Sequence, residues 1–368
     1  MCKSKQKIME ATDKELIIHP DNLRAFILKC LQSVGTPKQQ AEDLTELLVS
    51  ADQRGHYSHG VNRLDFYLSD ITNGLTCVDK EPEVIKETVS TALVEGNNCL
   101  GPVVGKYCID IAIQKAKTTG IGWVSARGSN HFGIAGWYSI RAMQQGLIGM
   151  AFCNTSPNMI PTRAKKMTLG TNPISVAAKG NNNEDFVLDM ATTAVAQGKV
   201  EIKRCLGQSV PVGWGLDRNG KPTTDTEEVL YHGGLNPLGG LEETSGYKGY
   251  GLAFMVELFC GILSGSTFGT NVRHWAGHSS PADLGQCFVA IDPKAFAPGF
   301  ETRLSTLIHQ CKDQEPAEGN TEILVPGEPE KIHIKLCEML GGIPYHPNQI
   351  DYVDSIAEKY GIEKLVRY

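Results

Sequence analysis

Residues 121–153, IGWVSARGSNHFGIAGWYSIRAMQQGLIGMAFC, form the stretch that decides the fold. The pattern predicts a strand over Ile121–Ala126, a glycine-rich turn over Gly128–Gly133, a helix over Ala135–Gln145 and a strand over Leu147–Cys153. Strand, helix and strand in this order form a β-α-β unit, which is typical of α/β proteins.

The turn after the first strand is not a Rossmann dinucleotide fingerprint. Its residues, Gly128–Gly136, do not match GxGxxG, and Asn154 and Thr155 stand about where the acidic residue would follow. Further along, Ile174–Ala178 and Phe186–Met190 flank the turn at Gly180–Asn183 and predict a hairpin. The sheet is therefore expected to be mixed rather than all parallel.

The two ends of the chain are predicted to be helical. Asp21 is expected to cap a first helix whose apolar residues recur at spacings of three and four. Thr36, Pro37 and Gln39 then supply an N-cap, an N1 proline and a capping-box partner for a second helix. Two short helices are expected near Ile332–Leu340 and Gln349–Tyr360.

Between these ends, Gly249–Leu263 predicts a buried helix and Cys287–Ile291 a strand, while Lys312–Glu330 is typical of a surface connection. We therefore expect three parts. They are an N-terminal helical part (1–118), a middle α/β part (119–295) and a C-terminal segment (296–368) that packs back on the first.

The composition is that of a folded globular protein. At about 150 residues per domain, 368 residues correspond to two units or to one large core. Hydrophobic residues make up 41% of the chain and 39 glycines add to them, which excludes intrinsic disorder. The net charge is −6 with Lys and Arg scattered along the chain, so the basic patch of a nucleic-acid-binding protein is not visible.

Cysteine usage and hydropathy bear on the cellular compartment. The 11 cysteines include no CxxC pair and indicate free thiols in a reducing compartment. The polar start of the chain, Met1–Lys14, has no apolar core of a secretory signal. The longest apolar stretch, Gly249–Gly265, contains Glu257 and is short for a bilayer span. We expect a soluble, cytoplasmic protein.

The segment Ser58–Arg63 is the first candidate site. If Ser58 caps a new helix, His59 and Arg63 lie four residues apart on one face. A guanidinium can clamp a carboxylate and an imidazole can exchange a proton with a neighbouring hydroxyl or carbonyl oxygen, which suits a 2-hydroxy or 2-oxo acid. The alternative is a polar helix face on which Arg63 pairs with Asp65 or Asp70.

Other candidate residues lie at predicted strand ends and helix starts. The turn Gly128–Gly136 precedes a helix, where free N–H groups favour a phosphate, or it is only a tight turn. Small polar residues at Thr155–Pro157, Gly170–Pro173 and Asp189–Thr193 line a ligand pocket or simply form turns. Lys248 contacts a phosphate or ribose, or it is merely solvated.

Metal and serine-hydrolase chemistry are disfavoured. His56 with His59, and His274 with His278, are spaced like ligands, but carboxylates or a cysteine pair at ligand spacing do not accompany them. The nucleophile motif GxSxG is absent from the sequence.

Taken together, eight short motifs give the chain a family resemblance from about residue 20 onward. It resembles the malate/L-lactate dehydrogenase family, which is unrelated to the Rossmann-fold malate and lactate dehydrogenases. The motifs are ADQRGHYSHG (51–60), SNHFG (129–133), GTNP (170–173), LDMAT (188–192), NPLGG (236–240), YKGYGL (247–252), AIDP (290–293) and VPGE (325–328).

This resemblance implies a three-layer α/β fold with a mixed sheet, NAD or NADP as cofactor, and a homodimer with its active site near the subunit interface. It implies that His59 is the proton donor and acceptor, with Ser58 beside it in the relay. Arg63 would bind the substrate carboxylate and Thr171 would contact the substrate. Residues that would line the cofactor are His131, Phe132, Gly133, Ile134, Ala135, Asp189, Met190, Ala191 and Lys248.

One departure from the family bears on the reaction. Some imine-reducing members carry an aspartate in the segment that corresponds to Ala196–Val200, where this chain has Lys199. We therefore expect a dehydrogenase of malate-, lactate- or sulfolactate-type acids, with NAD as the favoured cofactor. The alternatives are an NADPH-dependent reductase of a cyclic imine acid such as Δ1-piperideine-2-carboxylate, and a dinucleotide-binding protein without catalysis.

Overall fold

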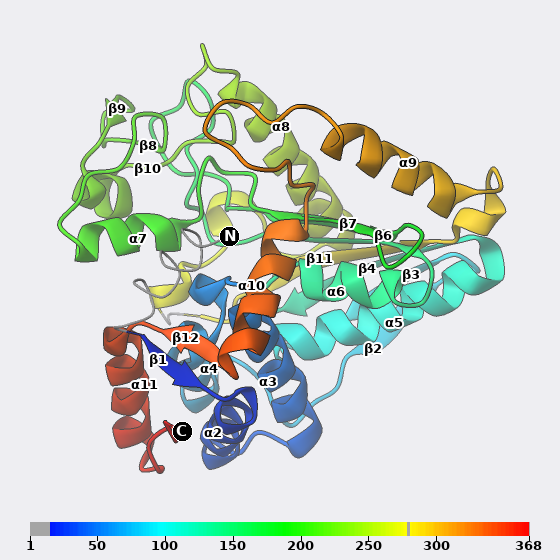
Figure 1. Cartoon of the computed structure of the whole chain (residues 1–368). Helices are drawn as coiled ribbons and strands as arrows, with labels where there is room; N and C mark the ends of the chain where they lie inside the picture. Colours follow the sequence, from blue (N-terminus) through cyan, green and yellow to red (C-terminus); the bar gives the residue numbers. More distant parts are fainter. Residues whose placement is uncertain (1–14, 278–279, 368) are drawn as a thin grey trace. The chain divides into compact units, whose positions relative to one another are not determined.

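The computed structural model describes residues 15–277 and 280–367, which form two compact units. The helical unit comprises the residues up to Gly74 together with those from Glu328 onward, and the sheet unit comprises Leu75–Gly327 (Figure 1). The limits of these units differ from the segment limits at 118/119 and 295/296 that the sequence suggested. The C-terminal helices belong to the same unit as the N-terminal ones.

A seven-stranded mixed sheet is the centre of the sheet unit, as expected. Only β3 and β4 pair in parallel, and the other neighbouring strands are antiparallel. The spatial order is β2 (Glu83–Glu87), β3 (Thr91–Glu95), β4 (Ile121–Ser129), β11 (Leu284–Ile291), β5 (Ile148–Cys153), β6 (Ile174–Lys179) and β7 (Asp185–Met190). The predicted β-α-β unit and the β6–β7 hairpin are confirmed, with β11 lying between the two strands of the unit.

Helices cover both faces of this sheet, which gives three layers (Figure 1). On one face lie α5 (Gly101–Thr119) and α6 (Gly136–Met143), and Phe288 of β11 contacts the ring of Tyr138 there. Successive strand residues point to opposite faces. The neighbouring Cys287 and Val289 accordingly pack against α8 (Gly246–Glu257) and the π-helical turn that continues it, Leu258–Ile262.

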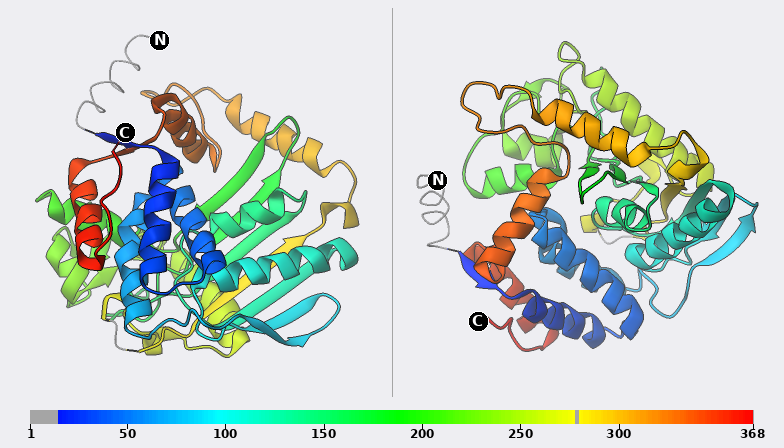
Figure 2. Two further views of the ribbon diagram at one scale, coloured as in Figure 1. Left: turned by 90° about the horizontal axis from the view of Figure 1, so that it is seen from below. Right: turned by 45° about the vertical axis from the view of Figure 1, so that its right-hand side comes forward.

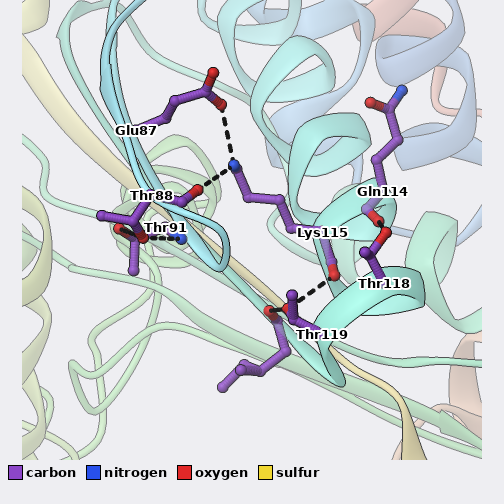
Figure 3. Close-up of polar contacts among 8 residues, drawn as sticks. Glu87, Thr88, Thr91, Gln114, Lys115, Thr118 and Thr119 are labelled. Atoms are coloured by element: carbon purple, nitrogen blue, oxygen red, sulfur yellow. Dashed lines mark hydrogen bonds and ion pairs between the residues drawn. The ribbon is translucent and has the colours of Figure 1, made fainter.

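The β2–β3 hairpin, at one edge of the sheet, is held by the C-terminal end of α5 (Figure 3). Lys115 donates to the Glu87 carboxylate at 3.0 Å and to the Thr88 carbonyl at 2.7 Å. Thr119 donates to the carbonyl oxygens of Lys115 and Ile121, which closes the helix onto the start of β4. The N-terminal part predicted over 1–118 therefore includes two strands and a helix of the sheet unit.

Further elements of the sheet unit lie outside the main sheet. A small sheet has the order β10 (Gly234–Leu235), β8 (Gly215–Leu216) and β9 (Pro222–Thr223). The other elements are α7 (Gln197–Cys205), a π-helical turn (Glu228–His232), 3-10 turns at Gly269–Asn271, Trp275–Gly277 and Pro293–Ala295, and α9 (Phe300–Lys312).

The helical unit packs helices from both ends of the chain around one core. They are α2 (Pro20–Ser33), α3 (Lys38–Gln53), α4 (Leu64–Thr72), α10 (Glu328–Leu340) and α11 (Pro347–Tyr360). A short strand from each end joins them, because β1 (Leu16–Ile18) pairs antiparallel with β12 (Ile343–Tyr345) (Figure 2).

Two details of the helices differ from the sequence prediction. His19, rather than Asp21, caps α2 by accepting the Asp21 N–H, and α3 begins after Pro37 without a side-chain cap, so the Thr36–Gln39 capping box is wrong. The buried helix predicted over Gly249–Leu263 exposes one side. Phe254 is 55% exposed and Ile262 52%, at the eight-residue spacing of one helix face.

In the part of the chain that the structure describes, no helix is long and apolar enough to cross a membrane. Nine of the cysteines are free thiols there, and seven of these are buried. This agrees with the free thiols expected from the sequence.

Candidate active site

The predicted site residues are divided between the two units. Ser58, His59 and Arg63 lie in the helical unit. The others lie in the sheet unit, namely residues 131–135, Thr171, residues 189–191 and Lys248. Each unit holds a group of these residues with its own internal geometry.

The segment with His59 and Arg63 is not one helix. It consists of two 3-10 turns, Tyr57–His59 and Val61–Arg63, and α4 begins only at Leu64. Gly60, with φ −92° and ψ −143°, separates the turns. The prediction of a single helix capped by Ser58 is therefore wrong, because an extended glycine interrupts the helical backbone between the two side chains.

The three predicted residues are nevertheless brought together. The Ser58 hydroxyl and Nδ1 of His59 lie 2.9 Å apart, and Nε of Arg63 donates to the Ser58 carbonyl at 2.7 Å. Burial, then the charges of Arg63 and His56, lower the pKa of His59 to about 3. A neutral imidazole at neutral pH can accept a proton, which is the state that a general base needs.

Arg63 lies next to an aromatic ring, and one of the two carboxylates suggested as its alternative partners pairs with another cation. Its guanidinium lies over the ring of Phe66, 5.5 Å from the ring centre. Asp65, one of the two suggested partners, forms an ion pair with Lys359 at 2.7 Å. Arg63 therefore makes a cation–π contact with Phe66 and donates a hydrogen bond to the Ser58 carbonyl.

Asp52 is a residue of this group that the sequence reasoning missed. It is fully buried near the end of α3, and its Oδ2 accepts the Val61 N–H at 2.9 Å and the Tyr345 hydroxyl at 2.6 Å. A Cβ on Gly60 would lie 1.8 Å from Oδ1 of Asp52, so the backbone at Gly60 is too close to this carboxyl group for any side chain. Asp52 thus ties the turn after His59 to β12. The sequence signal for Asp52 was its place next to Ala51 of the apolar face, where a carboxylate would be buried.

Burial also raises the pKa of Asp52, to about 7, although its two hydrogen bonds oppose the rise. His59 and Asp52 then act on stability in opposite directions as pH changes. Between pH 3 and 6.5, the unfolded chain binds more protons at His59 than the folded one, so the contribution of His59 increases with pH. Between pH 3.8 and 7 the folded chain binds more protons at Asp52, so the contribution of Asp52 decreases with pH.

We expect the two variants His59→Gln and Asp52→Asn to separate these effects. Relative to wild type, His59→Gln should lose stability from pH 4 to pH 6.5, and Asp52→Asn should gain it, each by up to about 1.4 kcal/mol per pH unit. Urea unfolding at pH 4, 5, 6 and 7 measures both slopes, and the other titrating groups cancel in the difference from wild type. Two variants with parallel curves would contradict this account.

In the sheet unit, residues 131–135 form the turn between β4 and α6. The side chains of Phe132, Ile134 and Ala135 are buried in the core, so these residues can reach a ligand only through their backbone. His131 stacks on Trp275 with ring centres 4.0 Å apart and planes 20° apart. The start of α5 packs directly against this turn, since a Cβ on Gly101 would lie 2.1 Å from the His131 carbonyl oxygen.

Asp189 occupies the start of α6. Its Oδ2 accepts the Gly136 N–H at 2.7 Å, and the next N–H groups bond to the carbonyls of Ile134 and Ala135. A carboxylate at a helix N-terminus satisfies the same N–H groups and dipole that would attract an anion. The Gly136 N–H at the start of α6 therefore has a protein partner, and an anion site at the rest of the turn Gly128–Gly136 stays a prediction.

The segments that carry Thr155, Thr171 and Thr192 lie close together. The Thr171 and Thr155 hydroxyls lie 3.2 Å apart, and the Thr192 hydroxyl donates to the Thr171 carbonyl at 3.0 Å. Met190 and Ala191 are partly buried at the end of β7, next to Thr192. The segments after β5, before β6 and after β7 therefore bring small polar groups and partly exposed backbone together at one end of these strands.

Glu257 is a second residue that the sequence reasoning did not assign. It lies 95% buried in α8, and its carboxylate accepts from the side-chain amides of Asn154 at 3.0 Å and Asn172 at 2.8 Å. It also accepts the Gly269 N–H at 2.9 Å. This network fixes the strand ends that carry Thr155 and Thr171.

Lys248 and Lys199 are both exposed. Lys248 lies in the first turn of α8, with its ammonium 6.0 Å from the centre of the Tyr247 ring. Lys199 lies in the first turn of α7. Among residues 15–277 and 280–367, the structure groups no set of three metal-binding side chains, and His278 of the second histidine pair lies outside these ranges.

Comparison with known proteins gives these residues a context. A family profile described as Malate/L-lactate dehydrogenase matches residues 18–354. The malate dehydrogenase of Pyrococcus horikoshii is 39% identical over 94% of this chain and 96% of its own, and the L-sulfolactate dehydrogenase of Methanocaldococcus jannaschii is 39% identical over 86% and 90%. The solved structure of the Pyrococcus horikoshii malate dehydrogenase matches with a TM-score of 0.88 over 96% of this chain and 98% of that chain.

Proposed function

Since the chain belongs to the malate/L-lactate dehydrogenase family, we propose that it interconverts a small 2-hydroxy acid and the corresponding 2-oxo acid. The observation that carries the proposal is the group in the helical unit, a neutral His59 bonded to Ser58 beside the guanidinium of Arg63. This group combines a base for a hydroxyl proton with a cation for a carboxylate.

His59 accepts the hydroxyl proton of the 2-hydroxy acid as the C2 hydride leaves, and as an imidazolium it returns this proton when the 2-oxo acid is reduced. Ser58 holds the imidazole through Nδ1 at 2.9 Å. Arg63 binds the carboxylate and fixes the orientation of C2. A bound nicotinamide dinucleotide would supply the hydride chemistry.

The sheet unit provides the groups that would hold this dinucleotide. The His131–Trp275 stack offers a flat aromatic surface, and the Thr155 hydroxyl offers a hydrogen bond 3.2 Å from the hydroxyl of Thr171, the residue that we propose contacts the substrate. Backbone groups of residues 132–135 and 189–191 and the ammonium of Lys248 complete the donor set. These groups suit a ligand with rings, hydroxyls and amides.

We propose NAD as the cofactor and a homodimer as the assembly. Relatives of this chain include a ureidoglycolate dehydrogenase named for NAD(+) and a (2R)-3-sulfolactate dehydrogenase named for NADP(+), so both dinucleotides belong in the assay. The exposed apolar side chains of Phe254, Leu258 and Ile262 on one side of α8 and its continuation support a self-association surface. Analytical ultracentrifugation measures the assembly.

The experiment for the activity follows absorbance at 340 nm with purified protein. Oxaloacetate, pyruvate, sulfopyruvate and Δ1-piperideine-2-carboxylate are each tested with NADH and with NADPH. Oxidation of NADH by a 2-oxo acid is the expected result. Turnover of the cyclic imine alone would replace the dehydrogenase with a reductase, and dinucleotide binding without any turnover would favour a binding role.

Replacement of Arg63 by alanine is expected to raise KM for the acid about 10- to 100-fold, the value of one or two charge-assisted hydrogen bonds. Lysine at this position keeps the charge but cannot form the bidentate hydrogen bonds of a guanidinium. Arg63→Lys should therefore recover part of the affinity that Arg63→Ala loses. Arg24→Ala, which removes a partly exposed arginine of α2 that pairs with Glu46, is the control. Steady-state kinetics measures all three variants, and an unchanged KM in Arg63→Ala would remove Arg63 from substrate binding.

A further inference from the structure

A basic pocket of about 390 Å³ lies in the sheet unit, outside the residues assigned above. Its walls come from the loop after β5, from the β8–β9 turn, from the end of the π-helical turn at His232 and from the segment 270–274. Its lining residues are Pro157, Lys165, Lys166, Met167, Arg218, His232, Gly233, Thr270 and His274. Five of these nine residues have basic side chains, and a carboxylate is absent from the described lining.

The positive charge of this pocket is only partly compensated. Arg218 forms an ion pair with Glu228, with Nε 3.2 Å from Oε2. Within the described residues, Lys165 and Lys166 form no ion pair. The whole chain carries a net charge of −6, so this pocket differs in sign from the protein around it. A concave surface lined by one sign of charge attracts ligands of the opposite sign.

The pocket differs from the start of α6 in having no carboxylate in its described lining. At the start of α6, the Asp189 carboxylate already occupies the first N–H group. The pocket adjoins the segment with the aromatic stack, because His274 lines it and Trp275 stacks on His131. The Ser156 hydroxyl, next to Pro157 of the pocket, holds this segment by accepting the Trp275 N–H and donating to the Arg273 carbonyl.

The size and lining of the pocket indicate the kind of anion. A volume of about 390 Å³ lies in the range of sites for small organic ligands, about 300–1,000 Å³, and exceeds what an inorganic phosphate needs. Pro157 and Met167 add apolar surface beside the lysines. We propose that this pocket binds a phosphorylated organic molecule of nucleotide size, with its phosphate on Lys165 and Lys166.

Isothermal titration calorimetry with ADP as the probe tests the pocket directly. Adenosine and inorganic phosphate are the partial ligands, and the titrations are run at low and at moderate NaCl concentration. We expect ADP to bind more tightly than either part, with an affinity that falls as salt rises. The double variant Lys165→Gln/Lys166→Gln should bind ADP at least about tenfold more weakly, since two charge-assisted contacts are lost.

Lys86→Gln in the edge strand β2 is the matched control, because Lys86 is exposed and does not line the pocket. A competition experiment with NADH decides whether the phosphate in this pocket belongs to the dinucleotide or to a separate ligand. Displacement of ADP by NADH assigns the phosphate to the dinucleotide, and simultaneous binding assigns it to a separate ligand. Equal ADP affinity in the folded double variant, or no ADP binding by the wild type, overturns the proposal. The readout is binding, so a failure of the proposed catalysis leaves this test intact.

Discussion

Replacement of His59 by alanine is expected to lower kcat/KM for the 2-hydroxy acid by about 10²- to 10⁴-fold, the usual contribution of a positioned general base. Affinity for the dinucleotide should stay unchanged, because the residues proposed to hold it lie in the sheet unit. The low pKa of His59 adds a second expectation. The base is already neutral above about pH 4, so wild-type oxidation should show no acid limb near pH 6.5.

The neighbouring histidine provides the control for this variant. His56 lies in the same loop, with Nε2 3.6 Å from the Glu330 carboxylate, and His56→Ala should keep most of the activity. Steady-state kinetics and fluorescence titration of NADH measure both variants. Intact turnover in His59→Ala would remove His59 from the reaction.

Replacement of Gly60 by alanine is expected to destabilise the helical unit by about 3 kcal/mol and to abolish most of the activity. The new methyl group would lie 1.8 Å from Oδ1 and 2.1 Å from Cγ of Asp52. Asp52 cannot withdraw at low cost, because it is fully buried and bonded to Val61 and Tyr345. The turn with His59 must therefore shift away from its place.

Gly251→Ala in α8 is the matched control, since a Cβ there meets nothing within 4 Å. Alanine in a helix is favoured over glycine by about 0.5–1 kcal/mol, so this variant should be as stable as the wild type or slightly more stable. Urea unfolding measures both variants. Equal stability of Gly60→Ala and Gly251→Ala would show that Asp52 and the turn can move apart freely.

Local patterns were sufficient to predict the elements that follow one periodicity. The hairpin of β6 and β7 combines two apolar runs with a glycine–asparagine turn, and it is found where expected. In α5, the glycines Gly101 and Gly105 weaken the local helix signal, although Pro102 stands in the first turn, where proline is compatible with a helix. The reason for Gly105 is tertiary packing, since a Cβ on Gly105 would lie 2.5 Å from the ring of Tyr138.

The candidate site was predictable as a set of residues but not as a geometry. Ser58, His59 and Arg63 lie together, yet through two 3-10 turns around Gly60 and not through one helix. Some of the contacts that hold the two groups of candidate residues join positions far apart in the chain. Asp52 meets Tyr345 across 293 residues, and Asn154 meets Glu257 across 103. Spacing rules describe neighbours within one element, so they carry no information on such pairs.

The discontinuous make-up of the helical unit has a consequence for the synthesis of the protein. The sheet unit, Leu75–Gly327, is one continuous stretch and can fold while the chain is still attached to the ribosome. The unit with His59 cannot be completed at that point, because β12 and Tyr345 follow the whole sheet unit in the sequence and are made after it. A nascent chain would therefore acquire its folded sheet before its ordered histidine.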